Sequence, residues 1–130
     1  MSSYRYKKGA GFERDLVDLF WRHGWAALRS AGSGSVKHPV PDVVAVRDGC
    51  IIAVECKTTG KTFLSLKKAV EALRRYELVS CAQAYLAVKF DRCKPRFYPL
   101  TLFNDLKGYT VKKSTGYLDF EMILGRQERL

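Results

Sequence analysis

Three charged residues, Asp42, Glu55 and Lys57, stand near the ends of a largely apolar stretch, residues 41–57. Two carboxylates and an ammonium group are side chains that can hold a divalent cation and stabilise a phosphoryl group. Mg²⁺ in particular prefers oxygen ligands and typically uses one or two carboxylates together with a substrate phosphate. This chemistry requires that the chain bring the three side chains to one place.

A tight turn within the stretch predicts that it does. Asp48 and Gly49 lie between two apolar runs, a pattern typical of a two-residue β-hairpin turn. In a hairpin with this turn, residues equally far from the turn on the two strands pair with each other. Asp42 therefore lies directly opposite Glu55. Lys57 lies two residues beyond Glu55 and therefore projects from the same face.

Such an arrangement is electrostatically costly without a partner. Opposed side chains on one face have Cβ atoms about 4.5–5.5 Å apart, and two like charges ~5 Å apart repel by about 3 kcal/mol at an effective dielectric constant of about 20. Protonation of one carboxylate, neutralisation by Lys57 or a bound cation would relieve the conflict. Alternatively, the strands separate before Asp42 and the charges reach solvent. We favour the cation, which would polarise a phosphoryl oxygen and lower the pKa of a bound water. A desolvated Lys57 would orient that water or stabilise charge on phosphorus.

The overall charge indicates a polyanionic partner. The chain has 23 Lys and Arg against 13 Asp and Glu, a net charge of +10. Because each neutralised phosphate releases condensed counterions, this surplus favours a nucleic acid partner over a merely soluble basic protein. The length of 130 residues and the 47% hydrophobic content predict a single globular domain spanning residues 1–130.

Hydrophobic periodicity predicts an α/β domain. Helical spacing occurs at 8–24, with Gly24 as its C-cap, at 64–79 and, less strongly, at 118–125. Strands are expected at 25–31, on both sides of the Asp48-Gly49 turn, and at 81–90, 96–103 and 109–113. The sum is a central mixed β-sheet of about five strands flanked by helices. No GxGxxG or GxxxxGK[ST] motif indicates a nucleotide-binding fold.

Other classes of protein are disfavoured. No run of about 18 apolar residues occurs, and the first residues lack the apolar segment of a signal peptide, so we expect a soluble cytoplasmic protein without a membrane partner. The four cysteines form no CxxC pair, and with two histidines they argue against a zinc site. We interpret the cysteines as reduced core residues. No small-molecule cofactor is indicated.

The charged cluster carries a family resemblance. Pro41-Asp42 followed by Glu55-Cys56-Lys57 resembles the PD-(D/E)xK signature of the restriction-endonuclease-like nucleases. In their order and spacing, KKGAGFERDL, LRSAGSGS, PDVVAV and AVECK closely resemble the archaeal Holliday junction resolvases. The similarity is good over residues 7–60 and thinner, but compatible, to the end. It implies the restriction-endonuclease-like fold.

The resemblance also implies roles for individual residues. Asp42 and Glu55 match the principal metal ligands, Lys57 matches the catalytic lysine, and the backbone carbonyl of Cys56 would be a further ligand. Glu13 heads the apolar stripe of the first helix and would complete the metal cluster, although a Glu in a first turn is usually a helix-dipole partner. Ser33 matches a serine needed for cleavage, although Ser/Gly loops are usually flexible connectors.

Basic residues are expected to contact the DNA backbone without reading its sequence. By resemblance, Arg14 and Arg29 would lie near the scissile phosphate; their alternative role is a surface charge or a salt bridge with Asp15 or Asp18. The remaining expected DNA contacts are Lys7, Lys8, Lys37 and Lys61, with Lys67 and Lys68 on the second helix.

The leading hypothesis from the sequence is a Mg²⁺-dependent, structure-selective endonuclease that resolves four-way DNA junctions in recombination and repair, with Mn²⁺ able to substitute. The family acts as a homodimer, because paired symmetric nicks need two sites related by a two-fold axis. The second helix, the 81–90 strand and the C-terminal apolar segment are the candidate dimer surfaces. Two alternatives are another small PD-(D/E)xK repair or restriction nuclease and a non-catalytic, junction-binding architectural protein.

Overall fold

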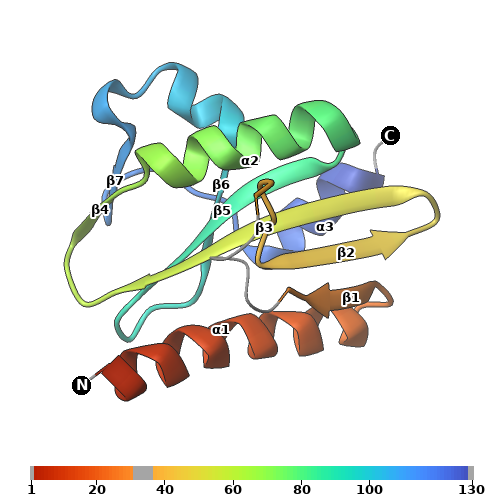
Figure 1. The fold of residues 1–130 in the computed structure, drawn as a ribbon, viewed down its shortest axis with the longest axis horizontal. Helices are drawn as coiled ribbons and strands as arrows, with labels where there is room; N and C mark the ends of the chain where they lie inside the picture. Colours follow the sequence, from red (N-terminus) through yellow and green to blue (C-terminus); the bar gives the residue numbers. More distant parts are fainter. Residues whose placement is uncertain (1, 31–36, 129–130) are drawn as a thin grey trace.

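A computed structural model describes residues 2–30 and 37–128. Its centre is a five-stranded mixed sheet with the order β1-β2-β3-β5-β6 (Figure 1). The central pair β3 and β5 is parallel, and the other neighbouring strands are antiparallel. The strands of this sheet are β1 (Ala26–Arg29), β2 (Val43–Arg47), β3 (Cys50–Thr59), β5 (Gln83–Phe90) and β6 (Arg96–Pro99).

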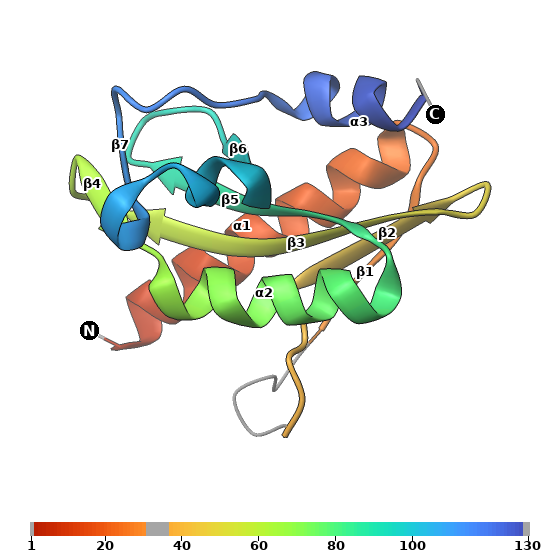
Figure 2. The ribbon, with the colours of Figure 1, turned by 90° about the horizontal axis from the view of Figure 1, so that it is seen from above.

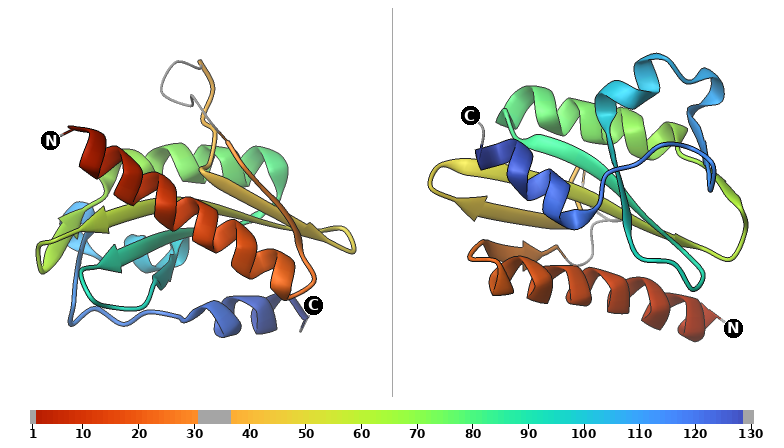
Figure 3. Two further views of the ribbon diagram at one scale, coloured as in Figure 1. Left: turned by 90° about the horizontal axis from the view of Figure 1, so that it is seen from below. Right: turned by 180° about the vertical axis from the view of Figure 1, so that it is seen from behind.

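Helices cover the two faces of the sheet, with α2 (Lys67–Ser80) on one side and α1 (Ser2–Arg22) and α3 (Phe120–Glu128) on the other (Figure 2). Figure 3 shows α1 lying across the strands. Alternate residues of β3 divide between two buried clusters, because successive side chains of a strand point to opposite faces. Ile52 and Val54 pack with the α1 side, whereas Ala53 packs with the α2 side. This central strand therefore carries its charged residues between two well-packed layers.

The hairpin between β2 and β3 has the predicted turn and register. Arg47 pairs with Cys50, and the pairing continues to Val43 and Val54. Asp48 and Gly49 both have positive φ, 48° and 80°, as a type I′ turn requires. The sheet of about five strands is likewise confirmed.

Gly24 ends the first helix as predicted. Its φ of 83° is left-handed, its N–H donates to the Trp21 carbonyl, and the Trp25 N–H donates to the Phe20 carbonyl. These are the two bonds of a Schellman motif, which turns the chain into β1. The helix itself begins earlier than predicted, at Ser2 instead of residue 8, because no proline interrupts the polar segment before it.

Two predicted elements have different bounds. Residues 64 and 65, expected in a helix, belong to β4 (Phe63–Ser65), which pairs with β7 (Thr110–Lys112) in a separate two-stranded sheet. Leu64 packs against the α2-side core, and this tertiary contact overrides the helical spacing. The strand expected at 96–103 ends at Pro99, whose missing N–H cannot extend a ladder. Two short 3₁₀ helices follow at Leu100–Asn104 and Lys107–Tyr109.

The cysteines are free thiols, but only Cys56 is fully buried; Cys50 and Cys93 are half-buried against the two core clusters. Cys81 is exposed, so its prediction as a core residue is wrong; it ends α2 in a left-handed conformation with its N–H bonded to the Glu77 carbonyl. Within residues 2–30 and 37–128, no helix combines the length and the apolar character needed to cross a membrane.

Candidate active site

Asp42 is fixed at the point where β2 begins. Its Oδ2 accepts a 2.8 Å hydrogen bond from the backbone N–H of Cys56, so the carboxylate turns toward β3 and not into solvent. Its carbonyl accepts a 2.9 Å bond from the Ser30 N–H, and the Ser30 hydroxyl donates to the Pro41 carbonyl at 2.8 Å. The regular ladder ends one residue short of Asp42, at Val43, but these bonds hold Asp42 in register with Glu55.

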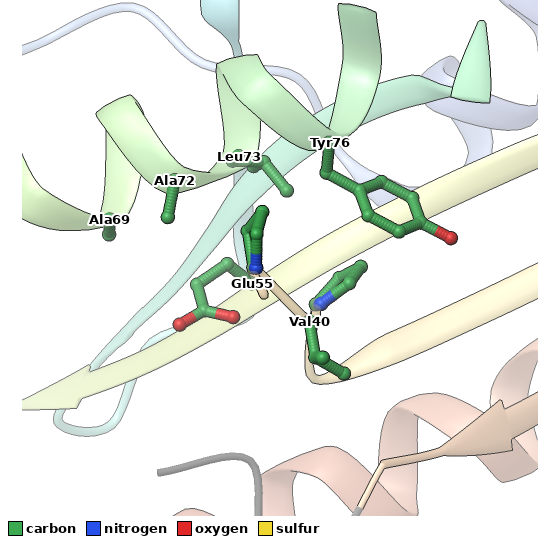
Figure 4. Close-up of a pocket in the computed structure, with 8 residues that line it drawn as sticks. Val40, Glu55, Ala69, Ala72, Leu73 and Tyr76 are labelled. Atoms are coloured by element: carbon green, nitrogen blue, oxygen red, sulfur yellow. The ribbon is translucent and has the colours of Figure 1, made fainter. Parts of the chain in front are cut away.

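Glu55 emerges from β3 under the α2 helix. It lines a cavity of about 30 Å³, room for roughly one water, between α2 and residues 39–41 (Figure 4). The cavity is lined by Pro39, Val40, Pro41, Glu55, Ala69, Ala72, Leu73 and Tyr76. Apart from Glu55, these side chains are apolar or aromatic, and only 22% of the Glu55 side chain is exposed.

The pKa of Glu55 is raised to about 8, chiefly by burial and then by the negative charge of Asp42. Lys57 acts in the opposite direction but does not cancel these effects. A side-chain hydrogen bond with Asp42 raises the pKa further, because Glu55 must keep its proton to donate it. The two carboxyl groups therefore meet, as the hairpin register predicts, and the protein relieves their repulsion with a proton when no cation is bound.

Lys57 lies on the same face of β3, with its Nζ 3.8 Å from Glu55 Oε2. Its side chain is 43% exposed, so the expectation of a desolvated lysine is wrong. An ion pair this long and this exposed adds little to stability. Lys57 is thus free to move toward a bound anion.

Glu13 approaches the pair from the opposite side, on α1, and is half-buried. Its Oε1 accepts a 2.9 Å hydrogen bond from the Arg29 Nε, which forms an ion pair between α1 and β1. Burial and the charge of Asp42 raise the pKa of Glu13, and Arg29 opposes them. Arg29 therefore has an acidic partner, but this partner is Glu13 and not Asp15 or Asp18.

The donor set fits a Mg²⁺ ion held by two carboxylates. Within residues 2–30 and 37–128, no three His, Cys, Asp or Glu side chains converge closely enough to hold a metal by themselves. Asp42 and Glu55 do meet, and Mg²⁺ commonly takes one or two carboxylates, with waters and phosphate completing its shell. Burial and the nearby carboxylates raise the pKa of the Cys56 thiol well above its usual value, so its sulfur stays neutral and a poor ligand.

The expected DNA contacts are distributed unevenly. Arg14, Lys37 and Lys61 are exposed, and Arg29 is half-buried in its bond with Glu13. Lys7 and Lys8 belong to α1, but their side chains lie outside the described part of the structure, as does Ser33. The exposed Lys67 and Lys68 begin α2.

Sequence reasoning missed Ser30, which ties the end of β1 to Pro41 and Asp42. The sequence position of Ser30 could have indicated this role. Arg29 pairs with Val43 of β2, so the next residue, Ser30, lies beside Asp42. The Cys56 N–H was missed for a related reason. The hydrogen bond from the Cys56 N–H to Asp42 involves the backbone, which every residue has, so the residue types do not indicate it.

Comparison with known proteins places this geometry in a family. Residues 4–130 match the model of the archaeal Holliday junction resolvase (Hjc) family. The chain belongs to the archaeal Holliday junction resolvase family. A crossover junction endodeoxyribonuclease Hjc of Methanocaldococcus jannaschii is 34% identical over 130 residues, which cover 98% of this chain and 94% of that protein. The Archaeoglobus fulgidus protein of the same name is 37% identical over 117 residues, 88% of this chain and 86% of its own.

The solved structure of A. fulgidus Hjc, a Holliday junction resolvase, superposes with a TM-score of 0.78 at 32% identity. The match covers 88% of this chain and 98% of that one. This likeness confirms the restriction-endonuclease-like fold expected from the sequence. Membership in the resolvase family likewise confirms that the chain is a nuclease.

Proposed function

We propose that the chain, acting as one nuclease domain, hydrolyses phosphodiester bonds at four-way DNA junctions with Mg²⁺ as cofactor. The observation that carries this proposal is the meeting of Asp42 and Glu55. Two carboxyl groups that meet in a largely buried position, with Lys57 beside Glu55, are a poor structural element and a suitable cation site. A net charge of +10 supports a polyanionic substrate.

In this proposal each residue has a distinct task. Asp42, oriented by the Cys56 N–H, and Glu55, after loss of its proton, hold the cation. When bound, Mg²⁺ supplies a Lewis acid that polarises the phosphoryl oxygen and lowers the pKa of a water. Lys57 donates to the charge that grows on phosphorus or orients the attacking water. The apolar wall formed by α2 and residues 39–41 reduces the exposure of Glu55 to solvent.

Glu13 and Arg29 act together on the α1 side. We infer that Arg29 would meet the scissile phosphate and that Glu13 would join the metal site; their ion pair and the influence of Asp42 on the Glu13 pKa support this. Transfer of Arg29 to a DNA phosphate would free Glu13 to join the metal shell, directly or through a water. The transfer of Arg29 from Glu13 to the DNA would then couple substrate binding to completion of the metal site.

We further propose that the chain acts in the cytoplasm as a homodimer that makes paired symmetric nicks. The sheet offers a surface for the contact. Leu28 and Val46 are both exposed, and the register puts them on the face that α2 covers elsewhere. Leu78 and Val79 are exposed on α2 itself. The β5 strand, a candidate from the sequence, is excluded because both of its edges are paired and its central residues are buried.

Cleavage of a synthetic junction tests the proposal. The protein with Mg²⁺ should nick opposing strands of a four-way junction, Mn²⁺ should substitute, and a chelator should abolish cleavage while sparing binding. Glu55→Ala should remove cleavage, and Asp105→Ala, which changes an exposed carboxylate outside the site and the proposed dimer surface, should not. Cleavage that survives Glu55→Ala would refute the site.

Two further measurements separate the alternatives. A panel of linear duplexes of varied sequence would be cut by a repair or restriction nuclease and left intact by a junction-selective enzyme. Calorimetric titration with Mg²⁺ distinguishes a nuclease from an architectural protein, because a binder without chemistry has no need of metal affinity. Symmetric nicking by a protein that sediments as a monomer would contradict the dimer.

A further inference from the structure

The two-stranded sheet β4–β7 presents an aromatic ring to solvent. Phe63 is 48% exposed and belongs to neither buried cluster, although its neighbour Leu64 packs into the α2-side core. Burial of a phenylalanine is normally favourable, so a ring left at the surface at a fixed position in a ladder suggests a contact with another molecule. The Phe63 backbone is held by its pairing with Lys112.

Two lysines flank this ring. Lys112 stands directly opposite Phe63, and the Lys61 Nζ lies 5.8 Å from the ring centroid. The Lys113 N–H donates to the Thr62 carbonyl at 3.1 Å, which extends the contact between the two segments beyond the ladder. A hollow of about 430 Å³ is lined by Thr62, Phe63, Thr110, Lys112, Lys113 and Ser114, with no acidic side chain among them. The surface combines an aromatic face, hydroxyl groups and positive charge, which is the composition that binds nucleic acid bases and phosphates together.

The β4–β7 surface follows the active-site strand β3 in the chain. The chain runs from Glu55 and Lys57 to the end of β3 at Thr59 and then into β4, on the side of the molecule where α2 begins (Figure 1). Thr59 lies about 13 Å along the strand from Glu55 at 3.3 Å per residue. Roughly four base steps of 3.4 Å span the same length of duplex. A DNA strand that crosses the active site would need to continue only about this far to reach the segment that leads into β4.

We propose that the β4–β7 surface binds junction DNA near its branch point, with the Phe63 ring stacked on a base face and Lys61 and Lys112 on the adjoining phosphates. This assignment rests on the function proposed above and adds a determinant of junction selectivity to it. In a continuous duplex every base face is covered by its neighbours, whereas a branch point interrupts the stack and exposes such faces. A ring that stacks on them favours junctions over duplexes, while the lysines attract both.

Substitutions at Phe63 separate stacking from charge. In the absence of Mg²⁺, Phe63→Ala and Phe63→Leu should each reduce the ratio of junction to duplex affinity by about 5- to 150-fold, the range measured for base–aromatic stacking (~1–3 kcal/mol). Phe63→Tyr should retain the ratio within about two-fold. Trp21→Leu, which changes an exposed aromatic side chain on α1, serves as the control and should leave it unchanged.

The salt dependence provides the second readout. Lys112→Ala should lower the slope of log K against log salt by about 0.9, the value for one lost phosphate contact, whereas Phe63→Ala should leave the slope unchanged. Rescue by Phe63→Leu, or equal losses on junction and duplex, would overturn the stacking role and assign Phe63 a structural one. If the unsubstituted protein cuts junctions but its Phe63 variants bind as it does, this proposal fails and the proposed function stands. If the unsubstituted protein cuts no junction, the proposed function itself fails.

Discussion

Replacement of Glu55 by glutamine should stabilise the metal-free protein and abolish its activity. Glutamine keeps the shape and the hydrogen-bond donor of the protonated acid, so the bond to Asp42 survives, but it cannot ionise. The wild-type carboxyl, with its pKa raised to about 8 by burial and by Asp42, must either hold its proton or carry a charge beside another charge. The structure therefore predicts opposite effects of one substitution on folding and on cleavage.

The magnitude follows from the pKa and its sign from linkage. Below pH ~4.5 Glu55 is protonated in both the folded and the unfolded chain, and its contribution to stability is fully present. As the pH rises toward about 8, the unfolded chain loses the proton while the folded protein retains it, so stability falls. A difference between 4.5 and about 8 corresponds to an upper limit of about 4–5 kcal/mol at 1.36 kcal/mol per pKa unit. Because the side chain is 22% exposed and near Lys57, we expect about 2 kcal/mol.

Urea unfolding in a chelating buffer measures the effect. Glu55→Gln and wild type should agree within about 0.5 kcal/mol at pH 4, and the variant should be about 2 kcal/mol more stable at pH 8. Glu71→Gln, on the exposed side of α2, should match wild type at both pH values. A Glu55→Gln variant that gains no stability at pH 8, or that still cleaves junctions with Mg²⁺, would refute the reasoning.

Three further substitutions probe the neighbours of Glu55. Asp42→Asn removes the charge that helps raise the Glu55 pKa, so the fall in metal-free stability should be smaller and should end at lower pH, and Mg²⁺ affinity should drop; an unchanged pH profile contradicts the coupling. Arg29→Ala removes the group that lowers the Glu13 pKa, and the acid limb of the cleavage profile should shift to higher pH with at least about ten-fold lower kcat/KM. Ser30→Ala frees the Pro41 carbonyl and loosens Asp42, which should weaken Mg²⁺ binding about ten-fold in calorimetry while junction affinity stays constant.

The part of the site that the sequence predicts is the part determined by local rules. Asp48 and Gly49 determine the turn, the turn determines the register, and the register brings Asp42 to Glu55. The apolar stripe of the first helix likewise predicts that Glu13 faces inward, as its half-buried position confirms. These inferences need only strand alternation and helix periodicity.

Contacts between distant segments were not predictable in this way. The Glu13–Arg29 pair joins residues 16 positions apart and depends on how α1 crosses the sheet. The exposure of Lys57 depends on where the α2 layer ends, and the β4–β7 pairing joins two three-residue strands that are far apart in the chain. Residue patterns describe which face a side chain takes, but they do not describe which remote segment meets that face.

Proton release on metal binding tests the central claim most directly. Because burial and Asp42 raise its pKa, Glu55 keeps its proton to a higher pH than an ordinary glutamate, and it must lose that proton to become a metal ligand. Calorimetry in buffers of different ionisation enthalpy should therefore record net proton release when wild type binds Mg²⁺, and the release should grow as the pH is lowered. Mg²⁺ binding that releases no proton, or that is unaltered in affinity and proton release by Glu55→Gln, would show that the Asp42–Glu55 pair is not the metal site.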